Sequence, residues 1–262
     1  MDVTTLVGVL VGFGAVIGGQ LLEGGHISAL LQPTAAIIVL GGTTGATMVS
    51  FPPSELLRAV RNVSKAIFPI AIDTEETIRL LVEFANKARK NGLITLEQDL
   101  KRVSDHFLRR GVELVVDGVE AEEVRLVLEI ELASYEESNK GSAEVFEAAG
   151  GFAPTIGIIG AVLGLIHVME HLSDTASLGA GIAVAFVATI YGLMTANIVC
   201  IPLSTKLKRR LKEQILQREI VIEGLMSLMK GENPRMIEQK LRGFNGTSQA
   251  GGGADEQKKK GA

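Results

Sequence analysis

One apolar stretch, residues 150–172 (GGFAPTIGIIGAVLGLIHVMEHL), strongly restricts what this chain can fold into. No Asp, Glu, Lys or Arg occurs between Glu147 and Glu170. A helix of about 18 or more apolar residues is long enough to cross the ~30 Å hydrocarbon core of a bilayer. Small residues also recur three and four positions apart within the stretch, which is the spacing at which membrane helices approach closely. The stretch is therefore predicted to be a membrane span that packs against other helices.

Three further segments lack charged residues, so the chain is predicted to cross the membrane four times. The four uncharged segments are residues 3–22, 27–54, 148–169 and 175–205. All 26 Lys and Arg residues lie in the two polar segments, and the short connections 23–26 and 170–174 contain none. Positive residues concentrate on the cytoplasmic side of membranes, so both termini and both polar segments are expected to be cytoplasmic.

The predicted fold class is an all-α integral membrane protein. It has four transmembrane helices, a helical cytoplasmic domain between spans 2 and 3, and a cytoplasmic C-terminal helix. Nothing in the sequence combines basic and aromatic residues into a nucleic-acid-binding patch. Spans 1 and 2 are expected in residues 1–51, the cytoplasmic domain in 52–147, and spans 3 and 4 in 148–203. The C-terminal helices are expected in residues 204–244 and a disordered tail in 245–262.

The larger polar segment shows the start and stop signals of separate helices. Asp73 followed by Glu76 forms a capping box, and Gly92 marks the end of that helix. A second short helix is predicted to begin at Thr95, with Gln98 as the partner in its cap. A long charged helix is predicted from about residue 120, and it can enter the third span unbroken because no proline precedes Pro154.

The interior of the four spans is short of chemical groups that move protons. No Asp, Glu, Lys or Arg lies near mid-depth, although such residues usually mark proton and ion relays in membranes. The polar candidates at depth are Thr189 and Tyr191, together with backbone carbonyls freed near Pro154 and Pro202. Helix packing and hydrogen bonding within the helix are the competing interpretations for both hydroxyls. If the protein moves protons, the titrating carboxylate must come from another chain.

A short motif offers an alternative from a different functional class. His167, Glu170 and His171 match the H-x-x-E-H pattern of inverted zinc proteases, with both imidazoles on one helical face. A catalytic zinc also needs a third protein ligand, and Asp174 is the nearest candidate. Because polar residues are common where a span meets the membrane surface, the zinc-hydrolase hypothesis is disfavoured, and no metal or other cofactor is expected.

Four motifs, in order along the chain, resemble the A-subunit of the bacterial flagellar motor stator, the MotA/PomA family. They are VLGGTTGAT in span 2, ARKNGLITLE in the polar segment, APTIGIIGAVLGL in span 3 and AFVATIYG in span 4, at residues 39–47, 88–97, 153–165 and 185–192. The similarity extends from the first span to about Phe244. Energiser subunits of the ExbB/TolQ type share the core of spans 3 and 4 but have three spans, and they remain the nearest alternative.

The resemblance implies a non-enzymatic subunit of an ion channel in the bacterial cytoplasmic (inner) membrane. Family A-subunits form a ring of five around two copies of a MotB-like B-subunit, whose membrane aspartate binds the driving ion. The complex couples inward ion flow to rotation against a FliG-like rotor protein of the switch complex. The implied partners are therefore the B-subunit, the rotor protein, membrane lipid and further copies of the chain.

The resemblance also implies roles for particular residues in the polar segment. Arg89 and Glu97 match charged family residues that face opposite charges on the rotor, and Lys90 matches a further basic position used in some members. An ion pair between Arg89 and Glu97 that holds the intervening turn is the competing interpretation.

In the spans, the resemblance implies an ion path and its coupling to movement. Pro154 and Pro202 match the prolines thought to link protonation of the B-subunit to movement of the cytoplasmic part. Sodium-driven members have a threonine where this chain has Ala161, and a methyl group cannot coordinate sodium, so protons are the expected driving ion. Thr189 matches a threonine that is present in both proton-driven and sodium-driven members. Tyr191 lies close to it in the same motif.

Overall fold

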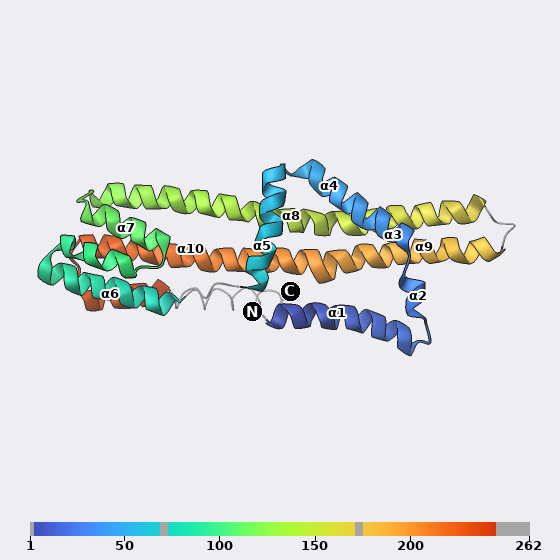
Figure 1. Ribbon diagram of the computed structural model, residues 1–262, viewed down its shortest axis with the longest axis horizontal. Coiled ribbons are helices and arrows are strands. Elements are labelled where there is room, and N and C mark those ends of the chain that lie inside the picture. Colours follow the sequence, from blue (N-terminus) through green and yellow to red (C-terminus); the bar gives the residue numbers. More distant parts are fainter. Residues whose placement is uncertain (1–2, 69–72, 171–174, 245–262) are drawn as a thin grey trace, which may run out of the picture. The chain divides into compact units, whose positions relative to one another are not determined.

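The computed structural model describes residues 3–68, 73–170 and 175–244, and all regular elements within these ranges are helices (Figure 1). The chain divides into two compact units, each described here by itself. One unit, the span unit, comprises residues 1–70 and 138–210, and the other, the polar unit, comprises residues 71–137 and 211–262. The predicted disordered tail, residues 245–262, lies outside the described residues.

Within these described ranges, four helical segments are long and apolar enough to cross a membrane, which agrees with the number of spans predicted from the charge pattern. The helices that form them are α1 (Val3–Leu22), α2 (Ile27–Leu30), α3 (Pro33–Ala36), η1 (Ile37–Gly41), α4 (Gly42–Ser50), α8 (Ala121–Glu170), α9 (Thr175–Met194), η3 (Thr195–Cys200) and α10 (Ile201–Met229). The long helix α8 enters the third span without a break, as the sequence predicted, and it also continues through Pro154.

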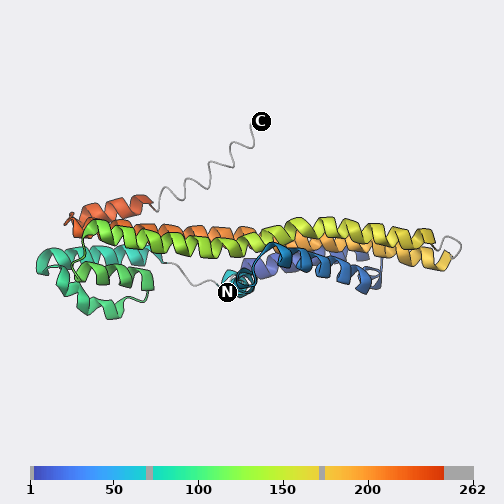
Figure 2. The ribbon, with the colours of Figure 1, turned by 90° about the horizontal axis from the view of Figure 1, so that it is seen from above.

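Helices α8 and α9 lie side by side in both ribbon views and touch through their backbones (Figures 1 and 2). A Cβ atom placed on Gly192 would lie 2.6 Å from the carbonyl oxygen of Ala153, and one on Gly164 would lie 2.8 Å from the amide nitrogen of Ala185. Both distances are far below van der Waals contact, so only glycine permits this approach. The seam confirms that the small residues of span 3 serve close helix packing.

Helix α5 (Pro53–Ile67) begins directly after span 2 and belongs to the span unit. Pro52 and Pro53 stop the preceding helix, and Pro53 starts the next one at a position where its missing N–H costs no hydrogen bond. Two polar contacts attach α5 to α8. Asn62 Nδ2 donates to Ser142 Oγ at 2.9 Å, and Arg58 Nη1 donates to the carbonyl of Ser138 at 2.8 Å.

The polar unit contains α6 (Thr74–Asn91), η2 (Leu93–Arg102), α7 (His106–Val116), the first part of α8, the last part of α10 and a helix over residues 234–244. The Asp73 carboxylate accepts from the Glu76 amide at 2.9 Å, and Gly92 adopts a positive φ of 85°, as the predicted caps require. The core of the polar unit consists of fully buried apolar side chains, among them Phe84, Phe107, Leu128, Leu225, Ile237 and Leu241.

The prediction of a helix that begins at Thr95 is wrong in both the type of helix and its first residue. Residues Leu93–Arg102 form a 3₁₀ helix, and the Thr95 hydroxyl donates back to the Gly92 carbonyl at 2.7 Å. Thr95 therefore lies inside the first turn and cannot cap it. The buried side chains of this segment, Leu96 and Asp99, are three residues apart, and a helix with three residues per turn places both on one face.

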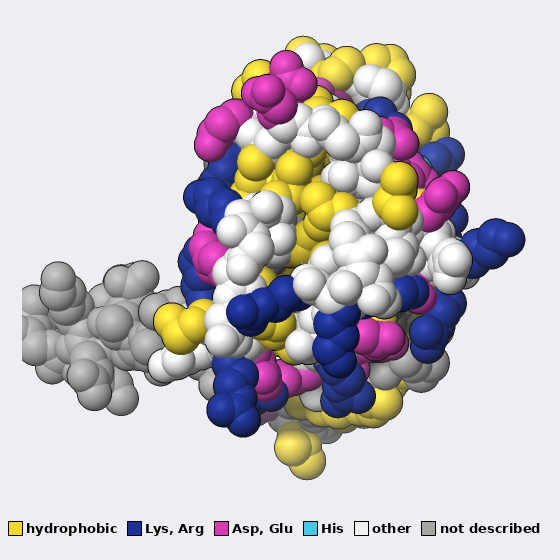
Figure 3. All heavy atoms as spheres, turned by 90° about the vertical axis from the view of Figure 1, so that its left-hand side faces the viewer, with side chains coloured by type: hydrophobic (Ala, Val, Ile, Leu, Met, Phe, Trp, Pro, Cys, Tyr) yellow, Lys and Arg dark blue, Asp and Glu magenta, His cyan; other side chains and the backbone are white. Residues whose placement is uncertain are grey.

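Charged and aromatic groups of the polar unit pair closely. The Arg218 guanidinium lies over the rings of Phe107 and Tyr135, 4.7 Å and 3.7 Å from their centroids. Burial raises the pKa of the Tyr135 hydroxyl, whereas the hydrogen bond from Lys240 lowers the pKa of the Glu223 carboxyl. In the end-on view of Figure 3, Lys and Arg side chains alternate with Asp and Glu side chains around a partly apolar face, so this face carries charge of both signs.

Candidate functional site

Pro154 lies inside α8, near the closest approach of that helix to its neighbours. A proline has no N–H, so the Gly150 carbonyl loses the donor that an ordinary helix would supply. Gly150 is buried, and a Cβ placed on it would lie 2.8 Å from Ile201 Cγ1. The helix therefore carries its one backbone defect at a tightly packed position of the span unit.

Pro202 lies just beyond η3, a π-helical segment, and the backbone continues from α9 through η3 into α10. The amide of Ile201 donates to the carbonyl of Ala196, five residues earlier. A wider turn of this kind accommodates a residue that cannot take part in the usual hydrogen-bond pattern. The sequence predicted a kink unless neighbouring helices absorb the defect, and the structure places a π-helical turn directly before Pro202.

The two polar candidates at depth are already hydrogen bonded within the chain. Thr189 Oγ1 donates to the carbonyl of Ala185 at 3.3 Å, which is the back-bonding anticipated from sequence. The Tyr191 hydroxyl donates to the carbonyl of Leu30 at 2.5 Å and accepts from the amide of Gln32 at 3.4 Å. Tyr191 thus fastens α9 to the segment between α2 and α3. Its partners are about 160 residues away along the chain, so no local pattern indicated them.

A small, mainly apolar cavity of about 320 Å³ lies between span 2, α8 and α9. Gln32 and Thr34, at the start of span 2, and His167 of α8 contribute its polar lining. Sequence reasoning did not select Gln32 or Thr34, although their position beside Pro33 at the start of an apolar segment was a usable signal. Ala161 is half-buried on the small-residue stripe of α8, four residues after Gly157.

The zinc hypothesis finds no additional support in the part of the chain that the structure describes. No group of three or more His, Cys, Asp or Glu side chains that could hold a metal occurs among these residues. His171 and Asp174 lie outside them.

Arg89, Lys90 and Glu97 lie around the α6–η2 turn of the polar unit, and all three side chains are exposed. The structure describes Arg89 and Glu97 and gives no ion pair between them. The turn is instead held by Lys87 Nζ, which lies 2.6 Å from Asp99 Oδ2; the Asp99 side chain is largely buried and the Lys87 side chain is partly buried. Sequence reasoning missed this pair, because it recognised the charges around the turn but not which of them point inward.

Replacing Asp99 with alanine is expected to loosen the α6–η2 turn, because the change leaves the half-buried Lys87 ammonium without its carboxylate. Removing one partner of a buried pair costs about 3–5 kcal/mol, and the residual exposure of Lys87 reduces that value to about 1–3 kcal/mol. Hydrogen exchange of residues 87–102 in the purified protein measures the effect. Glu97→Ala, a change at an exposed position of the same helix, should leave exchange unchanged. Equal exchange in the two variants would show that the pair does not hold the turn.

Known protein families and individual relatives match nearly the whole chain, including both units. Residues 99–220 match the MotA/TolQ/ExbB proton channel family, and residues 6–92 match the motility protein A N-terminal family. The chain is 38% identical to motility protein A of Bacillus subtilis (strain 168) over 243 residues, which covers 92% of this chain and 90% of that protein. It is 33% identical to chemotaxis protein PomA of Vibrio alginolyticus, with coverage of 93% and 95%.

Two solved structures have the same fold along almost the whole chain. The C. jejuni MotAB structure matches with a TM-score of 0.88 and 30% identity, covering 93% of this chain and 96% of that chain. The MotAB stator complex of Bacillus subtilis matches with a TM-score of 0.84 and 38% identity, covering 92% and 94%. The N-terminal match and the four spans together separate this chain from three-span energisers of the ExbB/TolQ type. The chain belongs to the motility protein A branch of the MotA/TolQ/ExbB proton channel family.

Proposed function

We propose that this chain is the A-subunit of a flagellar motor stator, a non-enzymatic protein that forms a proton channel together with a B-subunit. Inward proton flow through the complex drives torque on a FliG-like rotor protein. The relatives named MotAB are complexes of two proteins, and this chain matches their A-subunits over more than nine-tenths of its length.

One observation supports the proposal that the B-subunit, and not this chain, supplies the proton-binding carboxylate. None of the four spans has an Asp, Glu, Lys or Arg near mid-depth, and the hydroxyls of Thr189 and Tyr191 are engaged in hydrogen bonds within the chain. A proton path through hydrocarbon needs a titratable group. The carboxylate that binds the proton must therefore come from the B-subunit, while this chain shapes the passage around it.

The orientation and assembly follow from the charge pattern and the family. Both termini and the polar unit face the cytoplasm, because all Lys and Arg residues lie in the segments assigned to that side. Five copies surround two B-subunits in the inner membrane. Pro154 and Pro202 link protonation of the B-subunit to movement of the cytoplasmic part.

Proton flux into vesicles tests this function directly. Vesicles that contain the chain with its B-subunit should acidify when a proton gradient is imposed, whereas vesicles with this chain alone should not. A deletion strain complemented with both genes should swim. Selective proton flux through the chain alone, at the rate of the complex, would show that the acceptor lies in this chain and would overturn the proposal.

Swimming is expected to be independent of sodium. Ala161 offers a methyl group where sodium coordination needs an oxygen ligand, so replacing sodium by potassium at constant pH should leave swimming speed unchanged. Collapsing the proton gradient at constant sodium should stop the cells. Swimming that follows the sodium concentration would reject protons as the driving ion.

Charge reversal at the α6–η2 turn is expected to weaken rotor contact. Arg89→Glu and Glu97→Lys change exposed side chains that have no ion-pair partner among the described residues. Exposed ion pairs contribute about 0.2–1 kcal/mol each, so a single reversal should reduce torque only in part, and a compensating reversal on the rotor should restore it. Arg79→Glu, an exposed reversal elsewhere on α6, is the matched control. Torque from tethered cells is the measurement, and equal torque in all variants would remove these residues from the rotor contact.

A further inference from the structure

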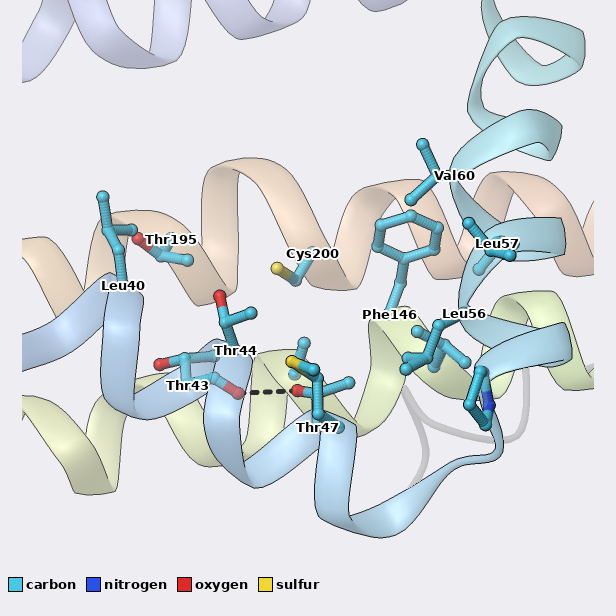
Figure 4. A pocket seen from close by; sticks show the side chains of 15 residues that line it. Leu40, Thr43, Thr44, Thr47, Leu56, Leu57, Val60, Phe146, Thr195 and Cys200 are labelled. Carbon is cyan, nitrogen blue, oxygen red and sulfur yellow. Dashed lines mark hydrogen bonds between the residues drawn. The ribbon is translucent and has the colours of Figure 1, made fainter.

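A second, larger cavity lies in the span unit where α4, α5, α8 and η3 meet (Figure 4). Its volume is about 580 Å³, within the range of pockets that bind small organic ligands. The lining is almost entirely hydrocarbon. It includes Leu40 and Met48 of span 2, Leu57 and Val60 of α5, Phe146 of α8 and Cys200 of η3.

The cavity leads from an exposed apolar mouth to a buried floor. Met48 is 62% exposed, and Leu57 and Val60 are each 70% exposed, whereas Thr43 and Cys200 are buried. In Figure 4, Leu57 and Val60 project from α5 at one side of the cavity, and Thr43 and Cys200 lie on its α4 and η3 sides. The mouth adjoins the end of span 2, so in the proposed orientation its apolar surface faces lipid chains rather than water.

Positive charge borders this mouth on the same helix. At about 100° per residue, Arg61 lies about 40° from Leu57 around the α5 axis, and Arg58 lies about 100° from it on the same side. Arg61 is exposed, while Arg58 is partly engaged by its hydrogen bond to Ser138. A helix with an apolar face, flanked by Arg or Lys at the level of lipid headgroups, is the arrangement that binds anionic membrane surfaces.

We propose that this cavity binds an acyl chain of an anionic phospholipid, with the lipid phosphate held near Arg61. The hydrocarbon lining fits an acyl chain, the exposed mouth at the end of a span gives access from the bilayer, and the adjacent arginine complements the phosphate. In the proposed orientation the lipid belongs to the cytoplasmic leaflet. The bound chain fills the space between span 2 and η3, beside the π-helical turn that precedes Pro202.

One polar group allows a hydrocarbon occupant to be distinguished from a polar one. Thr43 lines the cavity, and its Oγ1 is buried without a hydrogen-bond partner among the described residues. A polar occupant would bond this hydroxyl once the Thr43 side chain rotates toward the cavity, so Thr43→Val would weaken its binding. An acyl chain gains nothing from the hydroxyl, and Thr43→Val should leave lipid binding equal or stronger.

Photo-crosslinking tests the proposal on the full complex with its B-subunit. The complex is reconstituted in phosphatidylcholine bilayers that contain a minority of phosphatidylglycerol with a diazirine in its acyl chain. After illumination, mass spectrometry should find adducts on peptides that contain Met48, Leu57 or Cys200. Ala149→Leu narrows the cavity and should reduce these adducts to the level of other lipid-facing peptides. Ala148→Leu, the neighbouring residue outside the lining, should leave them unchanged.

A second variant tests the headgroup without touching the cavity. Arg61→Gln should reduce the preference for phosphatidylglycerol over phosphatidylcholine about fivefold, the effect of one basic residue near a membrane surface. Lys101→Gln, an exposed change in the polar unit, should not alter it. The crosslinking assay measures only contact between lipid and protein, so its result does not depend on motor activity.

Four results would overturn the proposal. They are adducts that persist in Ala149→Leu, an unchanged headgroup preference in Arg61→Gln, weaker crosslinking in Thr43→Val, and crosslinks that place a second copy of the chain over the mouth in place of lipid.

Discussion

Replacing Gly192 with valine is expected to abolish swimming and to lower the amount of folded protein in the membrane. A Cβ at this position would lie 2.6 Å from the carbonyl oxygen of Ala153 and 3.2 Å from Gly157 Cα. Both neighbours are backbone atoms, so no side-chain rotation relieves the clash. Helices α8 and α9 would have to separate, and overpacking that forces backbone shifts costs about 1–3 kcal/mol or more.

Gly179→Val provides the matched control for this change. Gly179 belongs to the same helix, and no atom lies within 4 Å of a Cβ placed there. Swimming, membrane abundance and thermal stability of the purified complex should therefore remain near those of the unmodified protein. Wild-type stability of Gly192→Val would mean that the two backbones do not approach each other as the structure shows.

Replacing Pro154 with alanine is expected to stop ion-driven rotation while leaving assembly intact. Alanine restores an N–H for the Gly150 carbonyl and removes a residue that disfavours the helix interior by about 3 kcal/mol. The helix should become straighter and more stable, so copurification with the B-subunit should persist. The carbonyl that the proline frees, and the deformable point that it creates, would both be lost. Swimming and proton flux should then fall together.

Pro53→Ala separates this effect from a general sensitivity to proline removal. Pro53 begins α5, where the missing N–H breaks no helical hydrogen bond, so its replacement should preserve swimming. If Pro154→Ala swims normally with confirmed expression, the defect in α8 plays no part in coupling.

Local chemistry made several elements predictable. The cap formed by Asp73 and Glu76 and the positive φ of Gly92 set the bounds of α6, because both depend on residues within a few positions of the helix ends. The 3₁₀ helix at Leu93–Arg102 was missed. Its buried side chains, Leu96 and Asp99, lie three residues apart, a spacing that both an α-helix and a 3₁₀ helix place on one face, so the sequence pattern did not distinguish the two.

The candidate sites likewise include residues that sequence motifs indicated and contacts that only the structure revealed. The residues Arg89, Glu97 and Pro154 were selected from motifs. The structure places Pro154 inside the long helix that the sequence indicated, Arg89 in the last turn of α6, and Glu97 in a 3₁₀ helix that the sequence did not predict. The ion pair of Lys87 with Asp99 and the bonds of Tyr191 to Leu30 and Gln32 were not anticipated. A side chain's partner depends on which surfaces meet after the helices pack, and spacing along one helix does not encode that.

Taken alone, the amino-acid order determined that this chain has four segments long and apolar enough to cross a membrane, with no Asp, Glu, Lys or Arg deep within them. Both conclusions follow from the high free energy of a charge in hydrocarbon, which depends on composition along each segment. Only the tertiary structure decided that α8 and α9 touch at Gly192, that a π-helical turn precedes Pro202, and that an apolar cavity opens beside α5. These features arise where separate helices meet, and their distances are set by packing between segments far apart in the chain.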